Sequence, residues 1–291
     1  MTISDIHSQA DIGQQIHALA QRLWGINRSI TGDGVRQTLA ILHELLPELL
    51  VHEVPSGTAA FDWTVPREWS ARDAYIVAPD GKRICEFSKN NLHLVGYSTP
   101  VRARMRLAEL QAHLYSLPEQ PSAIPYITSY YKERWGFCLS QQQRDSLVDG
   151  DYEVVVDTEL FDGCLSYGEL LVPGSSTQEV LVSTYLCHPS MANNELSGPT
   201  VTTYLARWVA ALPKRRYTYR FVFLPETIGS LTYISRNLDH LKSHVCAGFN
   251  VTCVGDDRAY SYLPSRRGNT ISDIVARHVL KHIDPHYKAY H

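Results

Sequence analysis

The chain has 291 residues, of which 44% are hydrophobic and 20% charged, and its formal net charge is −3. This is ordinary globular composition for one large or two ordinary domains. It shows no basic excess that would favour nucleic acid, and no apolar stretch reaches the ~18 residues of a membrane span. Residues 1–5 are not followed by the basic region and apolar run of a signal peptide, so we expect none, and none of the six cysteines forms a CxxC pair. We therefore expect a reduced cytoplasmic protein with no nucleic-acid or membrane partner, and composition leaves its oligomeric state open.

The first 60 residues predict two helices and a strand. Apolar residues recur at helical spacing across residues 11–24, as in an amphipathic helix. Residues 28–34 (RSITGDG) interrupt this pattern with two glycines, and a second helix is expected over 35–46, ending before Pro47. A strand is expected over 49–54.

Residues 61–173 have a different texture, with short β-like runs between turn residues. One helix is expected within this segment, over 101–117. We predict that 61–173 is a β-rich subdomain inserted into an α/β domain formed by residues 1–60 and 174–291.

From residue 179 onward, strand and helix patterns alternate. Strands are expected over 180–186, 217–224 and 246–254, and helices over 198–212, 229–241 and 271–283. Such alternation is typical of an α/β fold with a largely parallel sheet and helices on both faces.

Polar side chains follow three of these predicted strands. His188 comes after the first, Glu226 after the second, and Asp256 with Asp257 after the third. Because ligands in open α/β sheets bind beyond the carboxyl ends of the strands, these residues are candidates for a metal or acid/base site.

Each of these residues also has an ordinary alternative role. His188 could be a hydrogen-bonding residue in a loop, Glu226 an acid favoured by a helix dipole, and Asp256 a turn residue. Neighbouring side chains at a strand end point to opposite sides, so Cys187 is expected to pack in the core, away from His188.

The segment Tyr185–Gly198 (YLCHPSMANNELSG) resembles a family of bacterial proteins with an aminopeptidase-like domain, often encoded near surface-polysaccharide or secondary-metabolite genes. That family is similar to zinc-dependent exopeptidases of the bacterial leucyl aminopeptidase type. The resemblance spans nearly the whole chain. Its further motifs are RSITGDGVR at 28–36, FDWTVP at 61–66, IPY at 124–126 with WGF at 135–137, and PETIGS at 225–230.

The resemblance assigns roles to individual residues. His188 matches the first metal-binding histidine, and Glu226 matches the catalytic general base. Asn194, Thr227 and Thr252 fall at or near positions where the exopeptidases place acidic ligands. Neutral oxygens are weaker zinc ligands than carboxylates, so a site with one zinc is expected rather than two.

The expected function is therefore metal-assisted hydrolysis of an amide bond, at a free N-terminus or in an amino-sugar-like amide. Its substrate is expected to be a small or peptide-like molecule. Glu226 would be the general base, because a carboxylate can accept a proton from water and return it to the leaving amine. The expected metal ligands are His188, Asn194 and Asp256, and the expected substrate-binding residues are Arg28, Thr31, Asn193 and Ser197.

The neutral substitutions also leave a second hypothesis open. In it, the chain is a non-catalytic binding or scaffold module that retains the exopeptidase fold without a functional metal site. The resemblance further implies final strands and a C-terminal winged helix that do not follow residue 283, so we expect a truncated version or a fragment.

Overall fold

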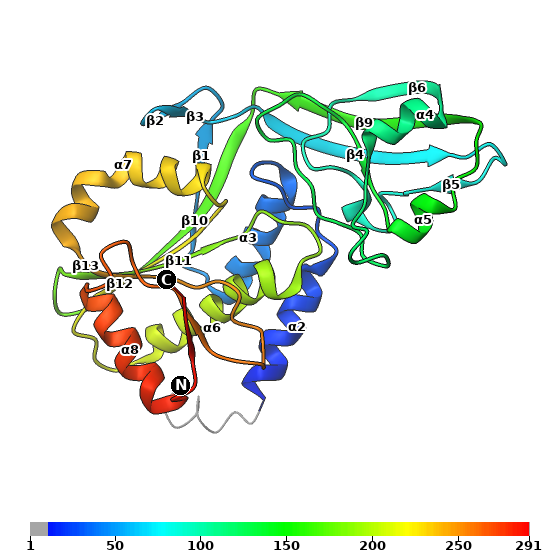
Figure 1. Cartoon of the computed structure of the whole chain (residues 1–291). Helices are drawn as coiled ribbons and strands as arrows, with labels where there is room; N and C mark the ends of the chain where they lie inside the picture. Colours follow the sequence, from blue (N-terminus) through cyan, green and yellow to red (C-terminus); the bar gives the residue numbers. More distant parts are fainter. Residues whose placement is uncertain (1–10, 291) are drawn as a thin grey trace. The chain divides into compact units, whose positions relative to one another are not determined.

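The structure is a computed structural model that describes residues 11–290 (Figure 1). The chain forms two compact units. The larger unit combines the residues up to Pro66 with those from Cys164 onward, and the smaller unit is Arg67–Gly163.

Two helices begin the described part of the larger unit, α2 (Ile12–Trp24) and α3 (Asp33–Leu45). Both lie within two residues of the predicted bounds. Their apolar stripes are buried, with Leu23 and Leu39 fully inaccessible to solvent. Burial of such a stripe against a sheet is what stabilises an amphipathic helix.

The centre of the larger unit is a five-stranded sheet (Figure 1). Its order is β1 (Leu50–Pro55), β10 (Cys164–Val172), β12 (Thr218–Leu224), β11 (Glu179–Tyr185) and β13 (Val245–Asn250). β11 pairs in parallel with β12 and β13, whereas β10 pairs antiparallel with β1 and β12. All strands but β10 run in the same direction, so the sheet is mixed and the expectation of a largely parallel sheet is met only in part.

The strand β10 also changes the bounds of the units. The predicted β-rich segment, 61–173, included this strand. In the structure it pairs with β1 along its length, from Leu50 opposite Glu169 to Pro55 opposite Cys164, and so belongs to the larger unit. A strand's partner lies far away in sequence, and periodicity does not identify it.

Helices cover both faces of the central sheet. α2, α3 and α6 (Ser197–Ala211) pack on one face, and α7 (Ile228–His244) lies over the other (Figure 1). The core against α2, α3 and α6 includes Phe221 and Phe223, which alternate along β12. α8 (Ile271–Ile283) packs beside the edge strand β13.

The smaller unit contains a four-stranded antiparallel sheet. Its order is β5 (Arg83–Ile84), β4 (Glu68–Val77), β9 (Asp151–Phe161) and β6 (Val101–Arg106). The helix predicted over 101–117 was wrong for residues 101–106, which form β6, and for Leu114–Tyr115, which form a short strand. Alternate residues of β6 are exposed, the period of two that a strand on a sheet surface requires.

The remaining elements are short. Those of the smaller unit are η1 (Asn91–His93), α4 (Leu107–Leu110), η2 (Gln111–His113), β7 (Leu114–Tyr115), β8 (Phe137–Cys138) and α5 (Gln141–Asp145). Those of the larger unit are β2 (Ala59–Ala60), β3 (Trp63–Thr64), η3 (Ala192–Leu196), β14 (Ser261–Tyr262) and β15 (Lys288–Ala289).

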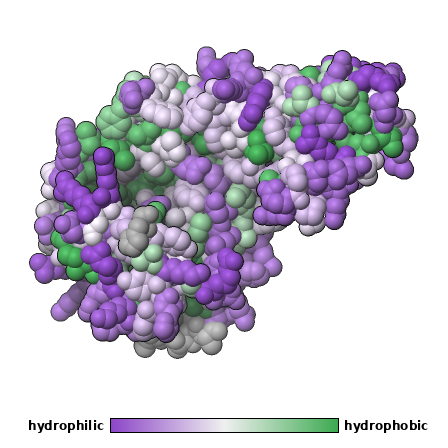
Figure 2. Space-filling model, viewed as in Figure 1, coloured by the Kyte–Doolittle hydropathy of each residue, from purple (hydrophilic) through white to green (hydrophobic). Residues whose placement is uncertain are grey.

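The outer surface mixes hydrophilic and hydrophobic residues. On the face shown in Figure 2, hydrophilic residues predominate and hydrophobic residues form small patches. Within residues 11–290, no helix combines the length and the apolar character that crossing a membrane requires.

Candidate metal site

His188 and Glu226 lie together at one edge of the central sheet. Their strands, β11 and β12, are parallel neighbours, with Tyr185 opposite Leu224. The two strands end at the same level of the sheet, so the side chains that follow them lie close together. His188 Nε2 is 3.5 Å from Glu226 Oε1. The rule that ligand-binding groups collect at the carboxyl ends of parallel strands correctly places this pair.

The pair is electrostatically coupled. Burial lowers the pKa of His188, but its hydrogen bond to Glu226 and the charge of Glu195 more than compensate, and the pKa is raised. The same hydrogen bond holds the pKa of Glu226 below its usual range. His188 is buried, whereas the side chain of Glu226 is 42% exposed. Glu226 is therefore an ionised carboxylate that solvent can reach.

Cys187 lies beside His188 and Glu226. Its sulfur lies 3.4 Å from His188 Nδ1 and accepts a hydrogen bond from the backbone N–H of Glu226 at 3.3 Å. The thiol is fully buried, and burial raises its pKa well above the usual range. The expected burial of Cys187 is confirmed, but its sulfur does not point away from His188, because β11 ends at Tyr185 and strand alternation does not continue past it.

A buried ion pair contacts the backbone of His188. Arg28 Nε donates to Glu195 Oε1 at 2.7 Å, and both side chains are inaccessible to solvent. Glu195 Oε2 accepts the backbone N–H groups of Cys187 and His188. Burial raises the pKa of Glu195, and the charge of Arg28 opposes this rise.

Arg28 and Thr31 were predicted to line the mouth of the site and contact substrate. The structure instead buries both, each at 1% exposure. The Arg28 side chain extends into the protein and donates to main-chain oxygens of His188 and Leu23. The loop glycines suggested a close approach to ligand, but the loop packs against the protein itself: a Cβ on Gly34 would lie 2.0 Å from the Asn27 oxygen.

Asn194 lies in η3, the turn that leads into α6. Its backbone is not helical (φ −94°, ψ 97°), unlike that of its neighbours in the turn. The amide oxygen accepts a hydrogen bond from the Tyr185 hydroxyl at 2.5 Å, and Thr252 donates to that hydroxyl. Burial raises the pKa of Tyr185 to about 12, and its ring lies beside that of His188. The oxygen predicted to bind metal thus accepts a hydrogen bond from a neighbouring side chain.

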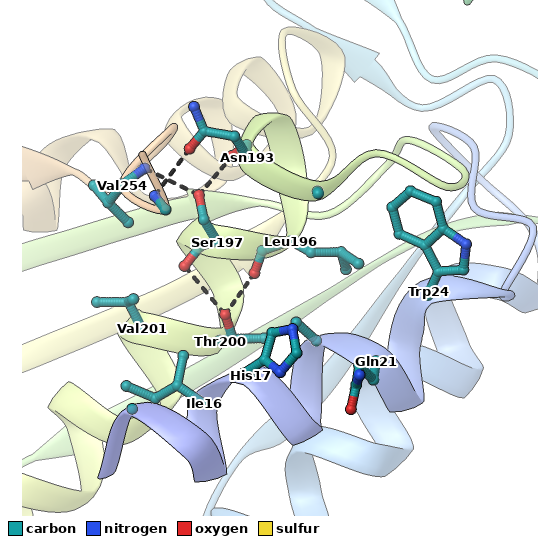
Figure 3. Close-up of a pocket in the computed structure, with 14 residues that line it drawn as sticks. Ile16, His17, Gln21, Trp24, Asn193, Leu196, Ser197, Thr200, Val201 and Val254 are labelled. Atoms are coloured by element: carbon teal, nitrogen blue, oxygen red, sulfur yellow. Dashed lines mark hydrogen bonds between the residues drawn. The ribbon is translucent and has the colours of Figure 1, made fainter. Parts of the chain in front are cut away.

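Asn193 and Ser197 connect η3 to the loop that follows β13 (Figure 3). Asn193 Oδ1 accepts from the N–H of Gly255, and Ser197 Oγ accepts from the N–H of Val254. Both residues also line a mainly apolar pocket of about 350 Å³ between α2 and α6, with Trp24 at one end. In this structure the two side chains hold loops together, and they face this pocket.

Asp256 is not part of the group formed by Cys187, His188 and Glu226. Its carboxylate pairs with Arg258, whose hydrogen bonds hold the pKa of Asp256 far below its usual range. Asp256 lies six residues beyond the end of β13, far enough for the loop to take its own course. Asp256 was predicted to lie just beyond the carboxyl end of this strand because the strand was predicted to run to residue 254.

Within the described residues, one group has a ligand arrangement suited to a metal ion. It consists of Cys187, His188 and Glu226, whose ligand atoms lie within 4.8 Å of one another. Sulfur, imidazole nitrogen and carboxylate oxygen are all donors that zinc accepts. The donor set therefore fits one zinc ion. Sequence reasoning missed Cys187 and Glu195, since their positions depend on a turn and on a partner 167 residues away.

Comparison with known proteins agrees with this architecture. The chain matches, over residues 17–291, the family described as Domain of unknown function (DUF4910). A Clostridium acetobutylicum protein, provisionally named a polysaccharide biosynthesis protein with an aminopeptidase-like domain, is 46% identical over 97% of this chain and 64% of its own length.

Two solved structures are similar in three dimensions. A C. acetobutylicum protein provisionally described as a peptidase has a TM-score of 0.94 at 45% identity, covering 98% of this chain and 67% of that one. BSAP, a zinc aminopeptidase from Bacillus subtilis, has a TM-score of 0.66 at 12% identity, covering 96% of this chain and 78% of that one. At 12% identity the likeness shows the fold alone.

The chain thus has a mixed α/β fold of the kind found in zinc aminopeptidases. It belongs to the family described as Domain of unknown function (DUF4910). It spans 64% of the length of the curated relative that it matches.

Proposed function

We propose that this chain is an aminopeptidase-like hydrolase that uses one zinc ion to cleave an amide bond. The observation that carries the proposal is the pairing of His188 with Glu226 at the carboxyl ends of two parallel strands, with Cys187 beside them. The names of the relatives, a peptidase and a protein with an aminopeptidase-like domain, support the same class of reaction.

In this proposal His188 and Cys187 would hold the ion, and Glu226, a third potential donor within reach, would remain unbound as the base. Zinc at such a position polarises a carbonyl and lowers the pKa of water. Glu226 accepts a proton at Oε1 and returns it to the leaving amine. Its lowered pKa keeps it ionised at neutral pH, and its partial exposure leaves it accessible to substrate.

The proposed substrate has an amide next to a free amine, in a peptide or in an amino-sugar derivative. The polysaccharide-related name of the relative favours the second type. We place the reaction in the cytoplasm, in agreement with the six cysteines of the described residues, none of which forms a disulfide.

Two variants test the assignment of roles. We expect His188→Ala to lose zinc, measured by elemental analysis of the purified protein. We expect Glu226→Gln to retain zinc but to lose turnover of aminoacyl amides by about 100-fold or more, since general-base catalysis contributes roughly 10²–10⁴-fold.

The outcomes separate the alternatives. If Glu226→Gln loses the metal, Glu226 is a ligand and another group is the base. If His188→Ala retains it, the assignment of His188 is wrong. A wild-type chain that binds no zinc and gains no thermal stability from it would instead favour a module without catalytic activity.

A further inference from the structure

The peptide groups on both sides of His188 are held by one ion pair. Glu195 Oε2 accepts the His188 N–H, and Arg28 Nε donates to the His188 carbonyl oxygen at 3.0 Å. Glu195 also accepts the N–H of Cys187 at 2.9 Å. The main chain that carries two of the three metal donors is therefore fixed by Arg28 and Glu195.

We propose that Arg28 and Glu195 are positioning residues for the metal site, and that their pair sets the direction in which the His188 ring faces Glu226. This inference rests on the proposed function, since it concerns how that site is held. Glu195 Oε2 also lies 3.8 Å from His188 Nδ1, so the pair acts on the ring from its Nδ1 side as well as through the His188 backbone.

Three segments meet at this pair. Arg28 comes from the loop before α3, Glu195 from η3, and His188 from the segment after β11. Arg28 Nη1 also donates to the carbonyl of Leu23, near the end of α2, at 2.7 Å. The Arg28–Glu195 pair thus connects the residues around His188 to helix α2, which packs in the hydrophobic core.

Stability alone is a poor explanation for this pair. Buried ion pairs are often no more stable than apolar side chains of similar volume, because removing two charges from water is costly. Among the described residues, Arg28 Nη2 has no hydrogen-bond partner, which adds to that cost. What the pair provides is direction, because a guanidinium and a carboxylate together satisfy a peptide N–H and a C=O at defined angles.

The test compares two buried glutamates of the same unit. Glu195→Gln keeps the size of the side chain but removes the charge that faces Arg28. Glu179→Gln is the matched control, since Glu179 is buried in an ion pair with Arg220 under α7. Zinc affinity of each purified protein is measured by competition with a chromophoric chelator.

We expect Glu195→Gln to weaken zinc binding by about 10- to 100-fold, the range found when a group that orients a metal ligand is removed. Glu179→Gln should lower the melting temperature but leave zinc affinity unchanged. Equal affinities of Glu195→Gln and wild type would overturn the inference, as would equal losses of affinity in both variants.

A second variant covers the case in which Glu195→Gln does not fold, because it leaves Arg28 buried without a counter-charge. Arg28→Met/Glu195→Gln removes both charges and restores an apolar stem at position 28. We expect this double variant to fold and still to bind zinc more weakly than wild type. Wild-type affinity in the folded double variant would contradict the positioning role.

A readout without metal separates this inference from the proposed function. In the zinc-free protein, ¹⁵N resonances of the His188 ring report its orientation and its interaction with Glu226. We expect them to shift in Glu195→Gln and to stay in place in Glu179→Gln. A wild-type chain that binds no zinc would refute the proposed function, whereas unchanged His188 resonances in Glu195→Gln would refute the positioning role.

Discussion

Thr227, the residue after Glu226, has a strained backbone. Its φ of 52° and ψ of −86° lie outside the regions that a β-branched residue normally adopts, and its side chain does not cap the helix α7 that follows. Such strain costs of order 1–3 kcal/mol and persists where the surrounding structure fixes it. Here it places Glu226 at the end of a tight turn beside His188.

We expect Thr227→Gly to raise the free energy of unfolding by about 1 kcal/mol, because relief of strain exceeds the entropy that glycine adds to the unfolded chain. Thr227→Ala retains a Cβ and should stay close to wild type. Denaturant unfolding measures both. Equal stabilities of the glycine and alanine variants would show that the backbone is not strained.

The residues of the site differ in how far the sequence could predict them. His188 and Glu226 follow two strands that alternate with helices, so a general rule of parallel sheets brought them together. Arg28 was predicted to bind substrate because a loop flanked by glycines can approach a ligand closely, but its side chain is fully buried in an ion pair. Its partner, Glu195, lies 167 residues away, and no local pattern connects the two.

Among the secondary-structure elements, α8 has in its first turn a carboxylate that accepts several hydrogen bonds. Asp273 forms a capping box with Thr270 and also accepts hydrogen bonds from Ser265 and Tyr262. These hydrogen bonds hold the pKa of Asp273 well below its usual range, although the residue is buried. The carboxylate therefore ties the loop before α8 to the first turn of the helix.

This arrangement predicts a pH dependence. A depressed pKa means that the stabilisation by Asp273 is present above the unfolded-state pKa of about 3.9 and is lost as the pH falls towards the folded-state value. Asp273→Asn should be less stable than wild type at neutral pH, and the difference should shrink below about pH 4. Asp284→Asn, at the other end of α8, controls for loss of one charge. A difference that is independent of pH would contradict this account.

Element predictions succeeded where the local pattern was decisive. The helices α2 and α3 have clear apolar stripes and were found within two residues of their predicted bounds. The segment Val101–Arg106 was predicted as helix, although its alternation of apolar residues with arginine fits a strand equally well. Only its pairing with β9 decides between the two, and that pairing is not local.

At the scale of the whole molecule, the class of fold could be predicted, but the place of β10 in the central sheet could not. Alternating strands and helices after residue 179 indicated an α/β architecture. The strand β11 does pair in parallel with β12 and β13, as such alternation predicts. β1 and β10 pair antiparallel, although the whole smaller unit lies between them in sequence. The chain's likeness to zinc aminopeptidases in fold therefore emerged from the structure more completely than from periodicity.

We propose that the residues around His188 form a site for one metal ion. The most direct measurement is the zinc content of the purified chain at saturation, by elemental analysis with a parallel calorimetric titration. We predict one zinc ion per chain, bound with the three donors Cys187, His188 and Glu226 in reach. Two ions per chain, or none, would contradict this claim.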